Sequence, residues 1–247
     1  MNLIIDIGNS YSKLSIYRGK TSFHLSSIKS NEHKLLISKI KQLKKQKQII
    51  KNVILSSVSS EHAELEDYLL NNFDFFIKLN HETKIPIKNL YKTPKTLGKD
   101  RLAAVVAANN IFPNTNVLVF DAGTALTIDF INENAEYIGG SISPGIEMRF
   151  KALNYFTKKL PKFNLNTDFD KSFGATTEEA IISGVQNGIL NEVEGYINKY
   201  SKKYKNLEII FTGGDTFFFK ERLTKKILTD PDIVMKGLNI ILEHNAK

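Results

Sequence analysis

One short pattern occurs twice in this chain, once in each half, and it constrains the fold more than any other feature. Near the N-terminus a hydrophobic run leads into Asp6-Ile7-Gly8-Asn9-Ser10, and a second strand-like run starts at once. In the other half a hydrophobic run leads into Asp121-Ala122-Gly123-Thr124, and again a second run follows. Glycine permits a tight reversal between two strands. The repeat therefore predicts two similar domains, each with an acid-bearing strand–turn–strand unit.

The residue types in this turn suit a phosphate group and a cation. Glycine has no side chain, so backbone N–H groups can approach an anion closely. Asn9, Ser10 and Thr124 add hydrogen-bond donors, and the aspartate at the strand end offers oxygen to a hard cation such as Mg²⁺. A single Asp-x-Gly is more often only a hairpin turn. Two copies, each within β-branched strands, favour a site for phosphate and metal.

Composition limits the class of protein. The chain has 247 residues, 42% of them hydrophobic, which is enough for two small domains with cores. It has no cysteine, so disulfides, thiolate nucleophiles and cysteine-bound zinc are excluded. No apolar run approaches the roughly 20 residues of a membrane helix, and a strand that begins by Leu3 leaves no room for a signal peptide. We therefore expect a cytoplasmic protein with no membrane partner.

The net charge of +8 raises the question of a nucleic-acid partner. Nearly all the basic residues are lysines, whereas proteins that read nucleic acids favour arginine for bidentate contacts. The lysines of residues 41–51 alternate with Ile40, Leu43 and Ile49, which is typical of the solvated face of a helix. The common P-loop and G-x-G-x-x-G nucleotide signatures are also absent. We therefore expect no nucleic-acid partner and no P-loop or Rossmann nucleotide site.

The order of predicted elements is the same in both halves of the chain. In the first half we predict strands at 2–6, 11–18, 21–27, 52–57 and 74–79, and helices at 32–48, 61–71 and 100–112. In the second half we predict strands at 117–121, 124–131, 135–142 and 207–212, and helices at 146–157, 177–200 and 232–245. Pro113-Asn114-Thr115-Asn116 marks the junction, which gives domains at 1–114 and 115–247. This order describes two duplicated ribonuclease-H-like α/β domains with a cleft between them, the architecture of the actin, hexokinase and Hsp70 superfamily.

An ordered set of short motifs resembles one family of that superfamily, the type III pantothenate kinases. The matching segments are Asp6–Ser10 with Lys13, Thr96–Arg101, Asp121–Asp129, Gly139–Gly145, Thr177–Gly184 and Thr212–Asp215. Ser10 stands where the family usually has threonine, and the hydroxyl is kept. The resemblance implies ATP-dependent phosphorylation of the primary hydroxyl of pantothenate to 4'-phosphopantothenate, the first step of coenzyme A biosynthesis. It also implies a homodimer, Mg²⁺ and a monovalent cation, K⁺ or NH₄⁺.

The resemblance assigns the substrate site to the segment before and at the start of the helix at 100–112. Asp100 matches the catalytic base of the family, although aspartate is also a common helix N-cap. Arg101 suits the carboxylate of pantothenate. The remaining substrate-binding positions implied are Tyr91, Gly98, Lys99 and Thr177, the last at a helix start that a Thr-x-x-Glu capping box also explains.

The resemblance assigns the nucleotide and the cations to the two repeated turns. ATP-binding positions are Asp6, Gly8, Asn9, Ser10, Lys13, Gly123 and Thr124. Asp6 is expected to hold Mg²⁺ through water, and Asp121 to ligate the monovalent cation.

Two other functions remain open at this point. A phosphatase of the same fold also places acids at strand ends, but it transfers phosphate to water. A non-catalytic regulatory or nucleic-acid-binding relative would keep the fold and the positive charge without turnover. The intact set of acids and phosphate-binding turns favours the kinase, because a site that has lost its function is free to lose these residues.

Overall fold

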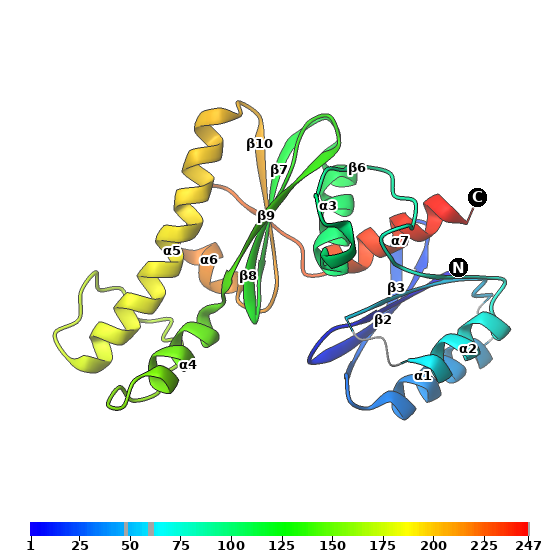
Figure 1. Ribbon diagram of the computed structural model, residues 1–247, viewed down its shortest axis with the longest axis horizontal. Helices are drawn as coiled ribbons and strands as arrows, with labels where there is room; N and C mark the ends of the chain where they lie inside the picture. The colour runs from blue at the N-terminus through cyan, green and yellow to red at the C-terminus, as the bar shows by residue number, and fades with distance from the viewer. Residues whose placement is uncertain (47–48, 59–61, 247) are drawn as a thin grey trace. The chain divides into compact units, whose positions relative to one another are not determined.

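The computed structural model describes residues 1–46, 49–58 and 62–246, which form two units (Figure 1). Unit 1 comprises Met1–Asn110 together with Asp232–Lys247, and unit 2 comprises Ile111–Pro231. Among the described residues, no helix is both long and apolar enough to cross a membrane.

Unit 1 is built on a five-stranded sheet in the order β3-β2-β1-β4-β5. Its strands are β1 (Asn2–Ile7), β2 (Tyr11–Arg18), β3 (Thr21–Lys29), β4 (Asn52–Ser57) and β5 (Phe75–Lys78). The first three strands are antiparallel, whereas β4 and β5 run parallel to β1. Helices α1 (His33–Lys45) and α2 (Ala63–Asn72) share a core cluster with Leu3, Ile5 and Ile7 of β1. Strand β1 is buried on both faces, which explains why its sequence is continuously apolar up to Asp6.

The C-terminal helix α7 (Ile233–Asn245) belongs to unit 1, whereas the sequence analysis placed residues 232–247 in the second domain. It packs on β1 and β4 and against α3 (Lys99–Ile111). The Asn2 side-chain amide donates to Asn239 Oδ1 at 2.9 Å, and Asn239 Nδ2 donates to the Gly19 carbonyl at 3.0 Å. The sequence of a helix at a chain end shows which face is apolar, but it does not show which sheet that face covers. That is why sequence order assigned it to the wrong domain.

Unit 2 repeats the strand arrangement of unit 1. Its strands are β7 (Asn116–Ala122), β8 (Ala125–Ile131), β9 (Glu136–Pro144), β10 (Leu207–Thr212) and β11 (Leu228–Thr229), in the order β11-β10-β7-β8-β9. Strands β7, β8 and β9 are antiparallel, and β10 runs parallel to β7. The helices are α4 (Ile146–Phe156), α5 (Thr177–Lys203) and α6 (Thr216–Arg222). Residues of all three helices join the core beneath this sheet, around the stacked rings of Phe120 and Phe211.

The segment between β5 and α3 has little regular structure, and the sequence analysis predicted no helix or strand between residues 79 and 100. It contains the two-residue strand β6 (Lys88–Asn89) and the 3₁₀ helix η1 (Pro94–Thr96). Helix α3 then begins at Lys99, one residue earlier than predicted. The short elements β6, η1, α6 and β11 were not predicted, because runs of two to seven residues carry no periodic signal.

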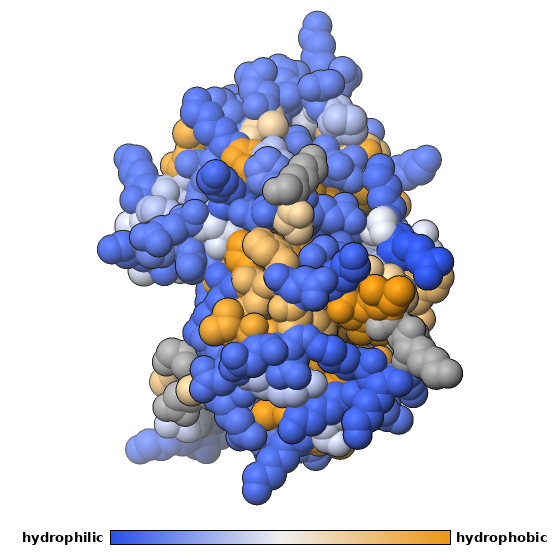
Figure 2. Space-filling view, turned by 90° about the vertical axis from the view of Figure 1, so that its right-hand side faces the viewer, coloured by the Kyte–Doolittle hydropathy of each residue, from blue (hydrophilic) through white to orange (hydrophobic). Residues whose placement is uncertain are grey.

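The lysine-rich helix α1 buries an apolar face and leaves its lysines at the surface. Leu36, Ile37, Ile40 and Leu43 are buried, and the exposed Lys41 lies over the Tyr68 ring at 5.2 Å. Hydrophilic side chains likewise cover most of the face drawn in Figure 2. The expectation of a solvated lysine face is therefore confirmed for the described part of this helix; residues 47 and 48 lie outside it.

Candidate active site

The turn between β1 and β2 is closed by backbone hydrogen bonds. The Gly8 N–H donates to the Tyr11 carbonyl at 3.1 Å, and Ser30 Oγ donates to the Gly8 carbonyl at 2.7 Å. A Cβ at Gly8 would lie 3.3 Å from the Tyr11 carbonyl oxygen, so the turn is tight around this glycine. Asn9 and Ser10 are exposed at its tip. The turn that was predicted to bind phosphate is thus held by hydrogen bonds, and its polar side chains lie at the surface.

Asp6 lies beside this turn, at the carboxyl end of β1. Ser56 Oγ, on the neighbouring strand β4, donates to Asp6 Oδ1 at 2.8 Å. Burial raises the pKa of the Asp6 carboxyl, and the charge of Asp100 raises it further. The Ser56 hydrogen bond and the charges of Lys13 and Lys99 act in the opposite direction. Asp6 and Asp100, far apart in the sequence, therefore belong to one electrostatic site.

The start of α3 holds Asp100 close to the backbone. Asp100 Oδ1 accepts a hydrogen bond from the Arg101 N–H at 2.8 Å. A Cβ at Gly98 would lie only 2.5 Å from the same Oδ1 atom, so only glycine leaves the carboxylate room in this position. Since the helix begins at Lys99, Asp100 is inside its first turn rather than at the N-cap. The interpretation of Asp100 as an N-cap is therefore wrong.

Arg101 and Tyr91 meet beside this carboxylate. The Arg101 guanidinium lies 5.7 Å from the centre of the Tyr91 ring, a cation–π arrangement, and the arginine is buried. A planar guanidinium held on an aromatic face is preorganised to bind a carboxylate in a bidentate manner. Tyr91, Gly98, Asp100 and Arg101 are thus brought together as the sequence analysis expected.

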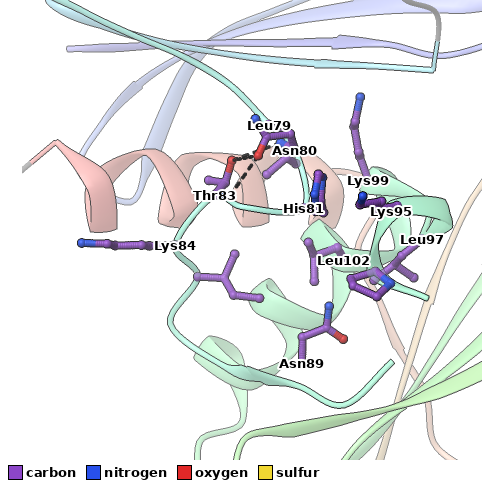
Figure 3. Close-up of a pocket in the computed structure, with 12 residues that line it drawn as sticks. Leu79, Asn80, His81, Thr83, Lys84, Asn89, Lys95, Leu97, Lys99 and Leu102 are labelled. Carbon is purple, nitrogen blue, oxygen red and sulfur yellow. Dashed lines mark hydrogen bonds between the residues drawn. The ribbon is translucent and has the colours of Figure 1, made fainter. Parts of the chain in front are cut away.

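The Lys99 side chain makes contacts that differ from those of its neighbours Asp100 and Arg101. Its Nζ atom donates to the Ser57 carbonyl at 2.7 Å, at the end of β4. The Lys99 side chain, with Leu97 and Leu102, also lines a cavity of about 430 Å³ beneath residues 79–85. Figure 3 shows its amino group pointing away from the middle of that cavity. The sequence analysis grouped Lys99 with the substrate ligands because it lies within the family motif Thr96–Arg101.

Unit 2 contains the second copy of the turn. The Gly123 N–H donates to the Ala125 carbonyl at 3.1 Å, as Gly8 does in the first copy. Gly145 donates to the Thr124 carbonyl at 3.1 Å, and a Cβ there would lie 2.1 Å from the Gly123 carbonyl oxygen. Thr124 itself is exposed. The turn is therefore fixed by the backbone of a second segment packed directly against it.

The segment after β10 reaches the same turn. Gly213 has φ +93°, and a Cβ there would lie 2.5 Å from Asp121 Oδ1. The Asp215 N–H donates to the Ala122 carbonyl at 2.9 Å. Burial, and then the charge of Glu147, raise the pKa of the Asp215 carboxyl. Asp215 is thus a second acid close to the Asp121 turn. The sequence analysis quoted Asp215 within a motif but gave it no role.

Thr177 is the first residue of α5, in unit 2. Thr176 Oγ1 accepts from the Glu179 N–H at 3.2 Å, and Glu179 Oε2 accepts from the Ala175 N–H at 2.8 Å. The predicted capping by Thr176 and Glu179 is therefore confirmed. Thr177 also lines an apolar cavity of about 840 Å³ formed with residues of α4.

The acids fit a metal that is completed by other ligands. Among the described residues, no group of three or more His, Asp or Glu side chains could hold a metal ion by itself. Magnesium in phosphoryl-transfer sites commonly keeps several waters and takes one or two carboxylates plus substrate phosphates. A single strand-end carboxylate beside a phosphate turn, as at Asp6, fits that mode of binding.

Sequence reasoning missed Ser56, which hydrogen-bonds the Asp6 carboxylate. Its signal is positional, because Ser56 and Ser57 follow the buried run of β4. Parallel neighbouring strands end at the same edge of a sheet, and β4 pairs with β1 in the register Asp6↔Ser56.

Comparisons with known proteins identify the family. The sequence model of the family described as type III pantothenate kinase matches residues 2–199. The type III pantothenate kinase of Phocaeicola vulgatus is 46% identical over 250 residues, which cover 100% of both chains. A conserved Baf family protein from Campylobacter jejuni superposes with a TM-score of 0.61 at 24% identity, covering 99% of this chain and 98% of that one. A glucokinase from an Antarctic psychrotroph superposes with a TM-score of 0.52 at 12% identity, covering 99% of each chain.

The solved structures confirm the predicted fold class, a duplicated actin-like α/β architecture, and the sequence relatives are similar over the whole length. The chain therefore belongs to the type III pantothenate kinase family.

Proposed function

We propose that the two acids of unit 1 carry the reaction of this family. The chain transfers the γ-phosphoryl group of ATP to the primary hydroxyl of pantothenate, which gives 4'-phosphopantothenate for coenzyme A biosynthesis. One observation supports the assignment most strongly. Asp100 lies near enough to Asp6 for its charge to raise the pKa of the Asp6 carboxyl. This proximity supports the assignment of Asp100 as the base that acts on a phosphate bound at the turn after Asp6.

In this proposal the turn of residues 8–10 binds the phosphates of ATP. The backbone N–H groups near Gly8 and the side chains of Asn9 and Ser10 donate to phosphate oxygens. Lys13, opposite Asp6 in the β1–β2 register, adds a point charge. Asp6 holds the divalent cation through water, and that cation supplies charge neutralisation on the phosphates. During turnover Asp6 would therefore orient a metal–nucleotide complex.

Asp100 is the base in this proposal. Its carboxylate accepts the proton of the pantothenate hydroxyl while the hydroxyl oxygen forms a bond to the γ-phosphorus. The bond from that phosphorus to the β,γ-bridging oxygen breaks, and ADP leaves with the electron pair. Arg101, held on Tyr91, binds the pantothenate carboxylate and sets the distance from hydroxyl to base.

The remaining assignments concern unit 2 and the assembly. Gly123 and Thr124 bind the nucleotide, Asp121 ligates K⁺ or NH₄⁺, and Thr177 contacts pantothenate. The enzyme works as a cytoplasmic homodimer with no nucleic-acid partner.

The test is an ADP-release assay with ATP and Mg²⁺, run with and without pantothenate and K⁺. Release that depends on pantothenate, with 4'-phosphopantothenate as product, is the expected result. Release of inorganic phosphate at the same rate without pantothenate would identify a phosphatase. Salt-dependent DNA binding without ATP turnover would identify a regulatory relative.

A further inference from the structure

We propose that Lys99 is a positioning residue, whose ammonium group is a fixed counter-cation for the Asp6 carboxylate and not a ligand for pantothenate. The inference rests on the proposed function of Asp6 and Asp100. It removes Lys99 from the substrate-binding group and gives it a role of its own.

The Lys99 ammonium is anchored at the strand end that adjoins Asp6. Its Nζ atom donates to the Ser57 carbonyl at 2.7 Å. Strand β4 pairs with β1 in the register Asp6↔Ser56 and Ile7↔Ser57. Ser56 donates to Asp6 Oδ1, so adjacent β4 residues hold the carboxylate and the ammonium. This geometry fixes a positive charge one residue along the strand from the contact made by Asp6.

The direction of the side chain argues against a contact with the substrate. Leu97, Lys99 and Leu102 line the cavity of Figure 3, and Tyr91 and Arg101 are not among its lining residues. The aliphatic part of Lys99 thus covers apolar surface while its amino group leaves the cavity toward the sheet. Arg101, the proposed ligand of the substrate carboxylate, and Lys99 therefore contact different parts of unit 1.

The charges that face Lys99 identify its partner. Burial and the charge of Lys78 lower the pKa of Lys99, whereas Glu66 and Asp6 act in the opposite direction. Lys78 and Glu66 form an ion pair with 2.6 Å between Nζ and Oε1, so they largely neutralise each other. Asp6 is left as the main charge for Lys99 to offset.

Two adjacent carboxylates disfavour each other's ionised form, and a nearby cation relieves the repulsion. The charge of Asp100 acts on the Asp6 carboxyl in this way, and the charge of Lys99 acts in the opposite direction. Because Lys99 directly precedes Asp100, its anchor on β4 also ties the first turn of α3 to the end of β4, which pairs with the end of β1 that carries Asp6. In this proposal one side chain thus offsets the charge of Asp6 and sets the spacing of the two acids.

The test compares Lys99→Met, which keeps the length and removes the charge, with Lys99→Arg, which keeps the charge. Lys95→Met is the control, because Lys95 lines the same cavity from η1 and lies outside the proposed catalytic machinery. Two quantities are measured: the kinetics of pantothenate phosphorylation, and Mn²⁺ binding to the nucleotide-free protein by electron paramagnetic resonance.

For Lys99→Met we expect kcat to fall about tenfold with KM for pantothenate within about twofold, because the acids lose their spacing but the substrate keeps its ligands. We expect Mn²⁺ to bind about fivefold more tightly, because the Asp6 carboxylate loses its counter-charge. Lys99→Arg should keep most of kcat and the wild-type Mn²⁺ affinity, and Lys95→Met should match the wild type in both.

A large rise in KM with kcat unchanged would instead make Lys99 a substrate ligand and overturn the proposal. Loss of kcat without tighter Mn²⁺ binding overturns it as well, since a merely structural role predicts that result. If Lys99→Met does not fold, as judged by circular dichroism, Lys99→Arg decides: a kcat and Mn²⁺ affinity unlike those of the wild type count against a role carried by charge. Should the wild type not phosphorylate pantothenate, the proposed function fails while the Mn²⁺ measurement still tests Lys99.

Discussion

Replacing Gly98 with alanine should damage catalysis while leaving the fold intact. The added Cβ would lie 2.5 Å from Asp100 Oδ1, whereas ordinary contacts begin near 3.4 Å. The clash is with the end of a side chain and not with the backbone, so the carboxylate yields by rotating about 1 Å away. A misplacement of that size in a reacting group costs about 10²-fold in rate.

The free energy of unfolding of Gly98→Ala, by contrast, should stay level or increase. Gly98 does not have a positive φ, so alanine can adopt its conformation. Gly→Ala at such a position stabilises by about 0.4–1 kcal/mol through the unfolded chain. We therefore expect kcat for pantothenate phosphorylation to fall about 10²-fold, and the melting temperature by scanning fluorimetry to stay level or rise.

The matched control is Gly195→Ala. A Cβ at Gly195, inside α5, meets no atom within 4 Å, so this variant should gain about 1 kcal/mol and keep full activity. Wild-type turnover in Gly98→Ala would refute the reasoning, because it would show that the Asp100 carboxylate does not need its observed position. A large drop in melting temperature would also refute it, since the clash would then involve more than one side-chain end.

Three further changes test other parts of the site and the fold. Asp100→Asn keeps the shape and removes the base, so kcat should fall by about 10²-fold or more while the melting temperature is unchanged; near-normal turnover would discard the assignment. Ser56→Ala removes a hydrogen bond that favours the ionised Asp6 carboxylate, so the pKa of Asp6 should rise further. The acid limb of the kcat–pH profile should then move to higher pH. If that limb does not move, the ionisation of Asp6 does not control kcat. Gly237→Ala would place a Cβ 1.8 Å from the Ala103 carbonyl oxygen, so urea unfolding should show a loss of about 1–3 kcal/mol; an unchanged midpoint would contradict the packing of α7 on α3.

The sequence predicted the parts of the site that depend on local chemistry. The strand–turn–strand units at Asp6 and Asp121 follow from glycine at a tight reversal between apolar runs, and both appear as β1–β2 and β7–β8. The grouping of Tyr91 with Arg101 came from the family motif, and the cation–π contact supplies its physical basis. The sequence did not show the long-range features: which sheet α7 covers and where the Lys99 amino group points depend on contacts between distant segments.

The two copies of the turn also differ in the residue that lies opposite the acid. In β1–β2 the register places Lys13 opposite Asp6, whereas in β7–β8 it places Thr127 opposite Asp121. A cation beside the first acid suits a site that must hold a triphosphate, because the charges of lysine and bound metal together offset the phosphates. Opposite the second acid stands a neutral hydroxyl instead of a charge. The duplicated backbone thus presents the same acid twice with a different residue across each strand pair, and we propose that this difference separates the divalent-cation site from the monovalent-cation site.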